Sequence, residues 1–187
     1  MNKIKLILMV ATFTIVTVTC LNIIDLPIKL RFEEAKYNYL FVSILSIALP
    51  LSIFLSSFTL KKWARIMTII ISIVVAFPSM IVFFFASESF SDISVEGVDT
   101  SFDKISEVES NGSTYRLYRT NGGATTSFGL VLRKEAKLTS NIKTVKVIFS
   151  KYQAREGTLM LINKNSLELR IEPYNENDKL EVITLTI

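Results

Sequence analysis

The sequence of 187 residues contains no histidine and only one cysteine, Cys20. Without histidine there is neither a Cys/His zinc site nor a nucleophile that relies on a His base, and one cysteine cannot form a disulfide within the chain. The Asp and Glu residues in the second half of the chain are scattered, and no two have the spacing of a catalytic pair. We therefore expect a protein that is not an enzyme and that holds no metal or cofactor.

Charged residues are also missing from three long apolar stretches, residues 6–24, 39–60 and 66–86. About 20 apolar residues are enough to cross a hydrocarbon core of roughly 30 Å. We expect residues 1–87 to form three transmembrane helices in a lipid bilayer. The first stretch also resembles a signal peptide that ends at Cys20, but Thr17-Val18-Thr19 does not suit lipoprotein processing, so we expect it to be retained. Spans without charge favour neither a transporter nor a pump.

Lysine and arginine predict the orientation of these helices. One side would hold Lys3, Lys5 and the tight cluster Lys61, Lys62 and Arg65. Basic residues accumulate on the cytoplasmic side, so we expect a cytoplasmic N-terminus and a C-terminal domain outside. The net charge of +4 arises from the membrane half, with 8 basic and 3 acidic residues, whereas the remainder has 13 and 14. The basic pI therefore does not predict nucleic-acid binding.

Small residues recur every four positions on the second and third predicted helices. Such stripes allow helix backbones to approach closely, and the short connection makes these two helices neighbours. Their mutual packing is the simplest interpretation, and a face for a foreign helix is the alternative. Pro50 and Pro78 lie in mid-helix and are expected to bend it. The candidate helix-packing face consists of Ala48, Ser52, Ser56, Thr68, Ser72 and Ala76.

The composition changes after the third apolar stretch. Residues 88–110 hold seven acids against Lys104, and we expect a short acidic stalk that leads into the first strand or a small helix. Residues 111–187 then alternate with period two. Tyr115 and Leu117 alternate with Arg116 and Tyr118, and Leu167, Leu169 and Ile171 alternate with charged residues. Val145, Val147 and Phe149 are expected to share one face, and Asn163–Ser166 has the composition of a hairpin turn. Five to seven strands would form a small antiparallel β-rich domain, a sandwich or half-barrel.

One loop between two predicted strands has a distinctive sequence. An Asn-Gly-Gly turn is all that a hairpin needs, yet consecutive backbone N–H groups, hydroxyls and nearby arginines also suit an anion-binding nest or a contact loop. As a phosphate loop it fails, because no Gly-Lys-Ser/Thr ending and no helix follow. The candidate contact loop comprises Arg116, Arg119, Asn121, Gly122, Gly123, Thr125, Thr126 and Ser127.

The segment from Tyr115 to Arg133 that contains this loop resembles a signature of small bacterial membrane proteins of unknown function. In these, a few N-terminal spans precede a short exported β-domain with a Gly-Gly-Ala-Thr-Thr-Ser hairpin. The resemblance covers about 20 residues closely. It implies a protein of the bacterial inner (plasma) membrane and supplies no catalytic residue.

Because the sequence favours neither an enzyme nor a transporter or pump, we expect a protein that acts by contact with a protein partner. The most concrete form is an immunity protein against a toxin that acts at the membrane or in the periplasm. The alternative is an envelope accessory or sensor protein whose exported domain binds an anionic ligand or a partner. The sequence does not choose between the helices and the β-domain as the functional part.

Overall fold

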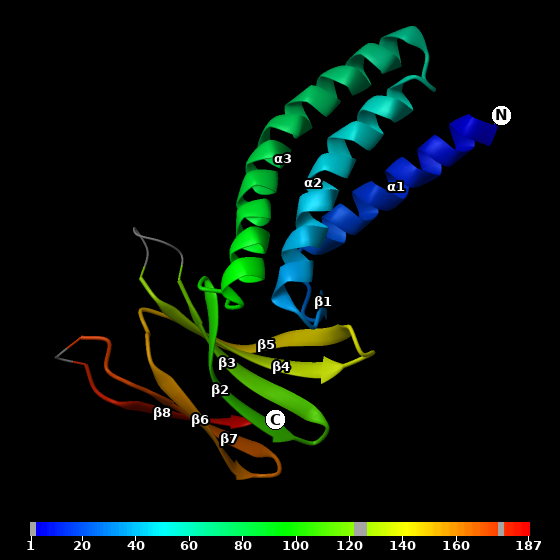
Figure 1. Cartoon of the computed structure of the whole chain (residues 1–187). Coiled ribbons are helices and arrows are strands. Elements are labelled where there is room, and N and C mark those ends of the chain that lie inside the picture. The colour runs from blue at the N-terminus through cyan, green and yellow to red at the C-terminus, as the bar shows by residue number, and fades with distance from the viewer. Residues whose placement is uncertain (1–2, 122–126, 176–177) are drawn as a thin grey trace. The chain divides into compact units, whose positions relative to one another are not determined.

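A computed structural model describes residues 3–121, 127–175 and 178–187 and divides the chain into two compact units (Figure 1). The helical unit comprises residues up to Leu26 and Glu34–Gly97. The β unit comprises Pro27–Glu33 and Val98–Ile187. The loop between the first two helices therefore belongs to the β unit and not to the helices that flank it.

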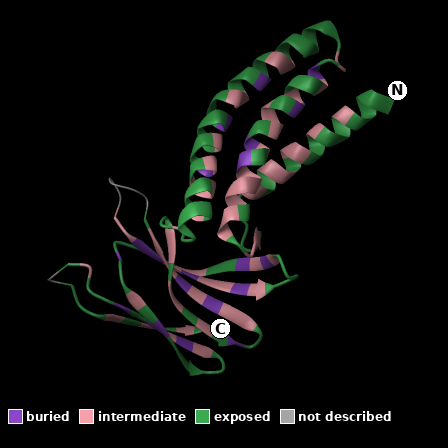
Figure 2. Ribbon diagram, in the orientation of Figure 1, coloured by how far each residue is buried: buried purple, intermediate pink, exposed green. Residues whose placement is uncertain are grey.

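The helical unit consists of α1 (Lys3–Ile23), α2 (Ala35–Ser57) and α3 (Lys62–Glu96). All three helices are long and apolar enough to cross a membrane, which confirms the predicted set and fits a multi-pass membrane protein. Most of their apolar side chains are exposed, and α1 buries none (Figure 2). Such surfaces are suited to contact with lipid.

Hydrogen bonds to backbone carbonyls mark the turn between α2 and α3 and the C-terminal end of α3. Arg65 Nη2 donates to the carbonyl oxygens of Phe58 and Leu60, at 3.4 and 3.3 Å, in the turn between the two helices. Helix α3 continues to Glu96, beyond the predicted span end at Ala86. It stops at Gly97, whose φ of +76° is accessible to glycine and whose N–H donates to the carbonyl of Ile93.

The β unit contains two antiparallel sheets, with strand orders β1-β5-β4-β3-β2 and β6-β7-β8. This arrangement confirms the predicted antiparallel β-rich domain after three helices. The hairpin predicted at Asn163–Ser166 also forms, because β6 and β7 join through Lys164 and Asn165. The strands after α3 are β2 (Phe102–Ser110), β3 (Ser113–Thr120), β4 (Gly129–Lys137), β5 (Ile142–Tyr152), β6 (Gly157–Asn163), β7 (Ser166–Ile171) and β8 (Glu181–Thr186).

Two strands lie in segments that were not predicted simply as strands: one was expected to be a loop, and the other to be part of the acidic stalk. Strand β1 (Lys29–Phe32) comes from the loop between α1 and α2 and pairs antiparallel with β5, from Lys29 opposite Val145 to Phe32 opposite Ile142. Strand β2 occupies the second half of the predicted stalk, and the first half continues α3. Segment 88–110 is therefore divided between a helix and a strand.

The core of the β unit lies between its two sheets and draws side chains from both. The period-two alternation predicted these inward positions correctly for β3 and β7, where Leu117, Leu167 and Leu169 are completely buried. Burial of nine such residues separates the sheets from water and holds them face to face. They are Tyr115, Leu117, Leu130, Leu132, Ala154, Leu159, Leu167, Leu169 and Ile171.

One predicted alternation is wrong. Val145, Val147 and Phe149 were expected to share a face, but the register shifts between Leu132 and Arg133, so that Leu132 lies opposite Phe149 and Arg133 opposite Val147. The extra residue in β5 forms a β-bulge, which interrupts strict alternation. Phe149 therefore packs against the core, whereas Val147 is 53% exposed on the opposite face.

Close approach of the two sheets at Gly157 leads to a stability prediction. A Cβ added there would lie 2.9 Å from the carbonyl oxygen of Arg170 and 3.1 Å from Leu130 Cδ1. We expect Gly157→Ala to lower the free energy of unfolding of the β unit by about 1–3 kcal/mol, the usual range for overpacking. Hydrogen exchange of the β7 amides across a urea series, on the full chain in detergent, would measure it. Thr158→Ala, at the exposed neighbour, is the control, and equal effects of the two substitutions would contradict the prediction.

Candidate contact site

The candidate contact loop is anchored at both ends. The N–H of Asn121 donates to the carbonyl of Ser101 at 3.0 Å, and the N–H of Ser127 donates to the hydroxyl oxygen of Tyr152 at 3.1 Å. Hydrogen bonding to the side chain and to the backbone of Ser127 lowers the pKa of Tyr152. The predicted residues between these ends, Gly122, Gly123, Thr125 and Thr126, lie outside the described residues.

Arg119, predicted to serve this loop, is paired with two carboxylates. Its Nη2 lies 2.8 Å from Asp103 Oδ2 and its Nη1 lies 2.7 Å from Glu156 Oε1. Its guanidinium also approaches the ring of Phe128, 5.8 Å from the centroid. An anion at Arg119 would have to compete with two acids that are already in place.

Arg116 is paired more completely, within a charge cluster on the face of the five-stranded sheet opposite the core. Its guanidinium contacts Glu107 at 2.8 Å and Glu135 at 2.7 Å, and its side chain is only 18% exposed. Burial works against its positive charge, but the carboxylates outweigh burial and raise the pKa of Arg116. Arg116 therefore holds neighbouring strands together.

Glu135 is the centre of this charge cluster, with a side chain that is 3% exposed. It accepts hydrogen bonds from Arg116 and from Tyr118 Oη at 2.8 Å, and it lies 2.8 Å from Lys143 Nζ. Burial by itself would raise the pKa of Glu135, but the bond and charge of Lys143, with Tyr118 and Arg116, place it below the ordinary value of 4.5. Burial and the neighbouring Glu135 carboxylate raise the pKa of Tyr118.

The charge cluster includes one residue from the loop between α1 and α2. Glu33 follows β1 and lies 3.5 Å from Arg116 Nη1 and 3.9 Å from Lys143 Nζ. Its backbone N–H donates to the carbonyl of Asn141 at 2.9 Å, which continues the β1–β5 pairing. This contact is not predictable from the sequence, because a strand of four residues has too little alternation to be recognised.

Arg133, the third arginine near the loop, stacks on aromatic rings beside the charge cluster. Its guanidinium carbon lies 3.8 Å from the centroid of Phe102 and 5.2 Å from that of Tyr118. Such stacking covers the ring faces and orients the cation. The arginines near the candidate loop are therefore engaged by carboxylates and aromatic rings of the β unit.

In the helical unit, the candidate helix-packing face is only partly buried. Ser52 and Ser72 are buried, and Ser72 Oγ donates to the carbonyl of Pro50 at 2.8 Å, which joins α3 to α2. The carbonyl of Ser52 accepts a bond from Thr12 Oγ1 of α1 at 3.0 Å. The other predicted positions are half-buried, namely Ala48, Ser56, Thr68 and Ala76.

The most buried positions of α3 follow a different spacing from the predicted one. Ser72, Ser79 and Ala86 are seven residues apart, and all three are buried. A seven-residue spacing keeps one face of a helix against an antiparallel neighbour, so it indicates a packing seam along α3. Counting small residues at this spacing would have found Ser79 and Ala86.

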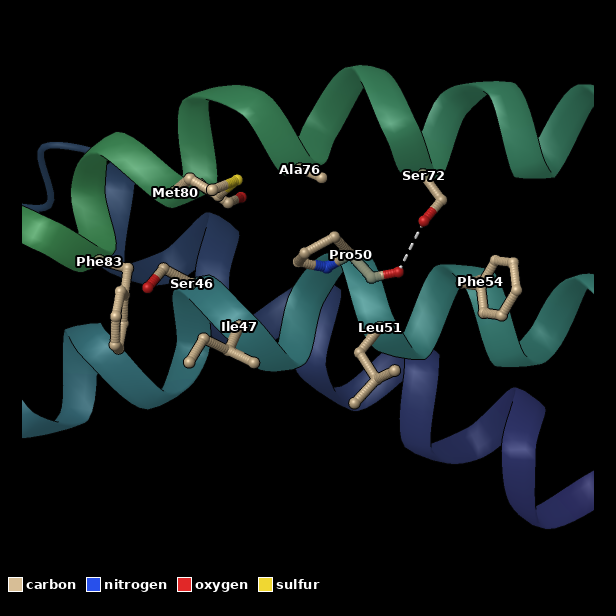
Figure 3. A pocket seen from close by; sticks show the side chains of 10 residues that line it. Ser46, Ile47, Pro50, Leu51, Phe54, Ser72, Ala76, Met80 and Phe83 are labelled. Carbon is tan, nitrogen blue, oxygen red and sulfur yellow. Dashed lines mark hydrogen bonds between the residues drawn. The ribbon is translucent and has the colours of Figure 1, made fainter.

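A groove of about 300 Å³ lies between α2 and α3 (Figure 3). Met80 and Phe83 of α3 and Ile47, Leu51 and Phe54 of α2 supply apolar side chains around it. The rest of its lining is small or polar, and none of its residues is charged: Ser46, Pro50, Ser72, Ala76 and Ser79. Such a surface can bind an apolar partner and supply hydrogen bonds to it.

The charge cluster gives a pH-dependent stability prediction. Because the pKa of Glu135 is lower in the folded state, its contribution is complete above pH 4.5 and is lost as the pH falls through that lower value. At pH 7 we expect Glu135→Gln to cost roughly 3 kcal/mol of unfolding free energy, since it leaves buried cations without their carboxylate.

The same hydrogen-exchange measurement, repeated between neutral and acidic pH, tests this prediction. The variant should lose less stability on acidification than the parent chain and retain the part due to Glu107, whose pKa hydrogen bonds from Lys104 and Arg116 also lower. Glu168→Gln, which removes a more exposed pair with Arg170, is the control and should cost less than about 1 kcal/mol. A similar cost for both variants would contradict the role of burial.

Among the described residues, no group of three or more His, Cys, Asp or Glu side chains is placed to hold a metal ion. Comparison of the chain with protein-family models, with curated proteins and with solved structures gives no match. Proposals about function therefore depend on the charge cluster and the groove themselves.

Proposed function

We propose that this chain is a multi-pass protein of the bacterial inner membrane that acts without catalysis, by binding another protein. Its most concrete role is immunity against a toxin that acts in the membrane or the periplasm. The groove between α2 and α3 carries this proposal, because it is an uncharged surface in two apolar helices with room for a partner's side chains.

The proposed topology has a cytoplasmic N-terminus and an exported β unit. Pairing of β1 with β5 supports it, because the loop between α1 and α2 and the segment after α3 must then lie on the same side of the membrane. Crossing by all three helices satisfies that requirement. The basic residues Lys61, Lys62 and Arg65 then lie on the cytoplasmic side, as the distribution of positive charge favours.

The alternative of an envelope accessory or sensor protein that binds an anion has less support. Its proposed contacts, Arg116 and Arg119, already pair with carboxylates of the β unit.

Fusions with alkaline phosphatase test the topology. The enzyme is active only after export, so we expect activity for a fusion after Ile187 and none for a fusion at Trp63, near the start of α3. A fusion inserted after Leu26, in the loop that precedes β1, should be active as well. Activity at Trp63, or its absence at Ile187, would contradict the proposed topology.

Co-expression with a toxin encoded beside this chain tests the immunity proposal. We expect the intact chain to restore colony formation and Ser72→Leu to lose most of that protection, because a larger side chain at the groove disturbs the contact between α2 and α3. Ser94→Leu, on the exposed polar end of α3, is the control and should still protect at equal membrane abundance. Failure of the intact chain to protect would reject immunity.

A further inference from the structure

The groove runs along the middle of two antiparallel helices. Its lining extends from Ser46 to Phe54 on α2 and from Ser72 to Phe83 on α3. At about 1.5 Å per residue these segments are roughly 12 and 16 Å long, about half of a hydrocarbon core of roughly 30 Å. A second helix crossing the same membrane would meet the groove over several turns.

Ser79 distinguishes this groove from ordinary helix packing. Its side chain lines the groove with only 9% of the residue exposed, yet it makes no hydrogen bond to any of the residues that the structure describes. The other two serines of the lining are bonded, Ser46 to the carbonyl of Ser43 and Ser72 to the carbonyl of Pro50. In hydrocarbon, a polar group without a partner is costly, so Ser79 favours an occupant that can hydrogen-bond to it.

Pro50 leaves a backbone acceptor on α2, on the other side of the groove from Ser79 of α3. Proline has no N–H, so the carbonyl of Ser46 cannot receive the bond that residue 50 donates in a regular α-helix. The carbonyl of Pro50 itself accepts the bond from Ser72. The helix beside Pro50 therefore has one more carbonyl acceptor than it has backbone N–H donors. A hydrogen-bond donor from a bound partner would pair with that carbonyl.

We propose that the groove binds a membrane-spanning helix of a partner protein, one that presents a small residue beside a side-chain amide or hydroxyl. A lipid acyl chain can fill the apolar walls but offers nothing to Ser79, whereas an amide or hydroxyl can donate and accept. Since no charged residue lines the groove, the contacting face of that helix is uncharged. This inference rests on the proposed contact function and identifies the chemistry of its partner.

Site-directed disulfide cross-linking in vesicles tests the proposal without a toxin. The full chain carries Cys20→Ser and Met80→Cys and is reconstituted in phosphatidylcholine and phosphatidylglycerol. The probe is a Leu/Ala spanning peptide of about 21 residues with one central cysteine and, one helical turn away, either Asn or Leu. Ile81→Cys is the matched control, because Ile81 is 46% exposed at the same depth but does not line the groove.

We expect the Asn peptide to cross-link to position 80 about fivefold faster than to position 81, and faster than the Leu peptide does, within the range of hydrogen bonds between membrane helices. Ser79→Ala, which keeps the residue small, should reduce the preference for Asn over Leu about threefold. Ala76→Leu should fill the groove and remove the difference between positions 80 and 81.

Three results would overturn the inference. Equal rates at positions 80 and 81 would show that the groove does not bind a helix. Equal rates for the Asn and Leu peptides would show that it does not recognise a polar group. Chain-to-chain disulfides at position 80 that outpace the peptide would assign the groove to a second copy. Because no toxin is present, rejection of immunity and rejection of the groove are separate outcomes.

Discussion

Pairing between β1 and β5 constrains the whole chain, because it places a strand from the loop between α1 and α2 in a sheet built from residues after α3. Only four residues form β1, and so short a strand contributes few backbone hydrogen bonds. Glu33 extends the attachment by adding ion pairs to Arg116 and Lys143. The loop between two helices is thereby held as part of a folded domain, and both segments must lie on one side of any membrane that the helices cross.

The charge cluster around Glu135 stabilises a buried carboxylate and aligns the strands that contribute to it. A carboxylate that is 3% exposed would be unstable alone, but Arg116, Lys143 and the Tyr118 hydroxyl surround it. Breaking such a cluster costs more than forming it gains, since one uncompensated charge would remain buried. The cluster therefore specifies how β1, β3, β4 and β5 align on one face of the sheet, while the apolar core holds the other face.

The helical unit is held together by other interactions than the β unit. Its helices expose apolar side chains, which are suited to contact with hydrocarbon, and the contacts between helices depend on small residues and on bonds such as that from Ser72 to Pro50. The groove between α2 and α3 occurs where small side chains and a proline coincide. We propose that this groove holds a helix, whereas Arg116 and Arg119 of the β unit pair with carboxylates of the same unit.

The sequence by itself determined the three helices, the β-rich domain and the inward positions of β3 and β7, because hydrophobic length and alternation are local properties. It did not determine β1, the bulge opposite Leu132 or the partners of Arg116 and Arg119, since these depend on residues distant in the chain. Ser79 illustrates the same limit in the helices. Its type and spacing are visible in the sequence, but whether its hydroxyl finds a partner depends on how α2 and α3 pack.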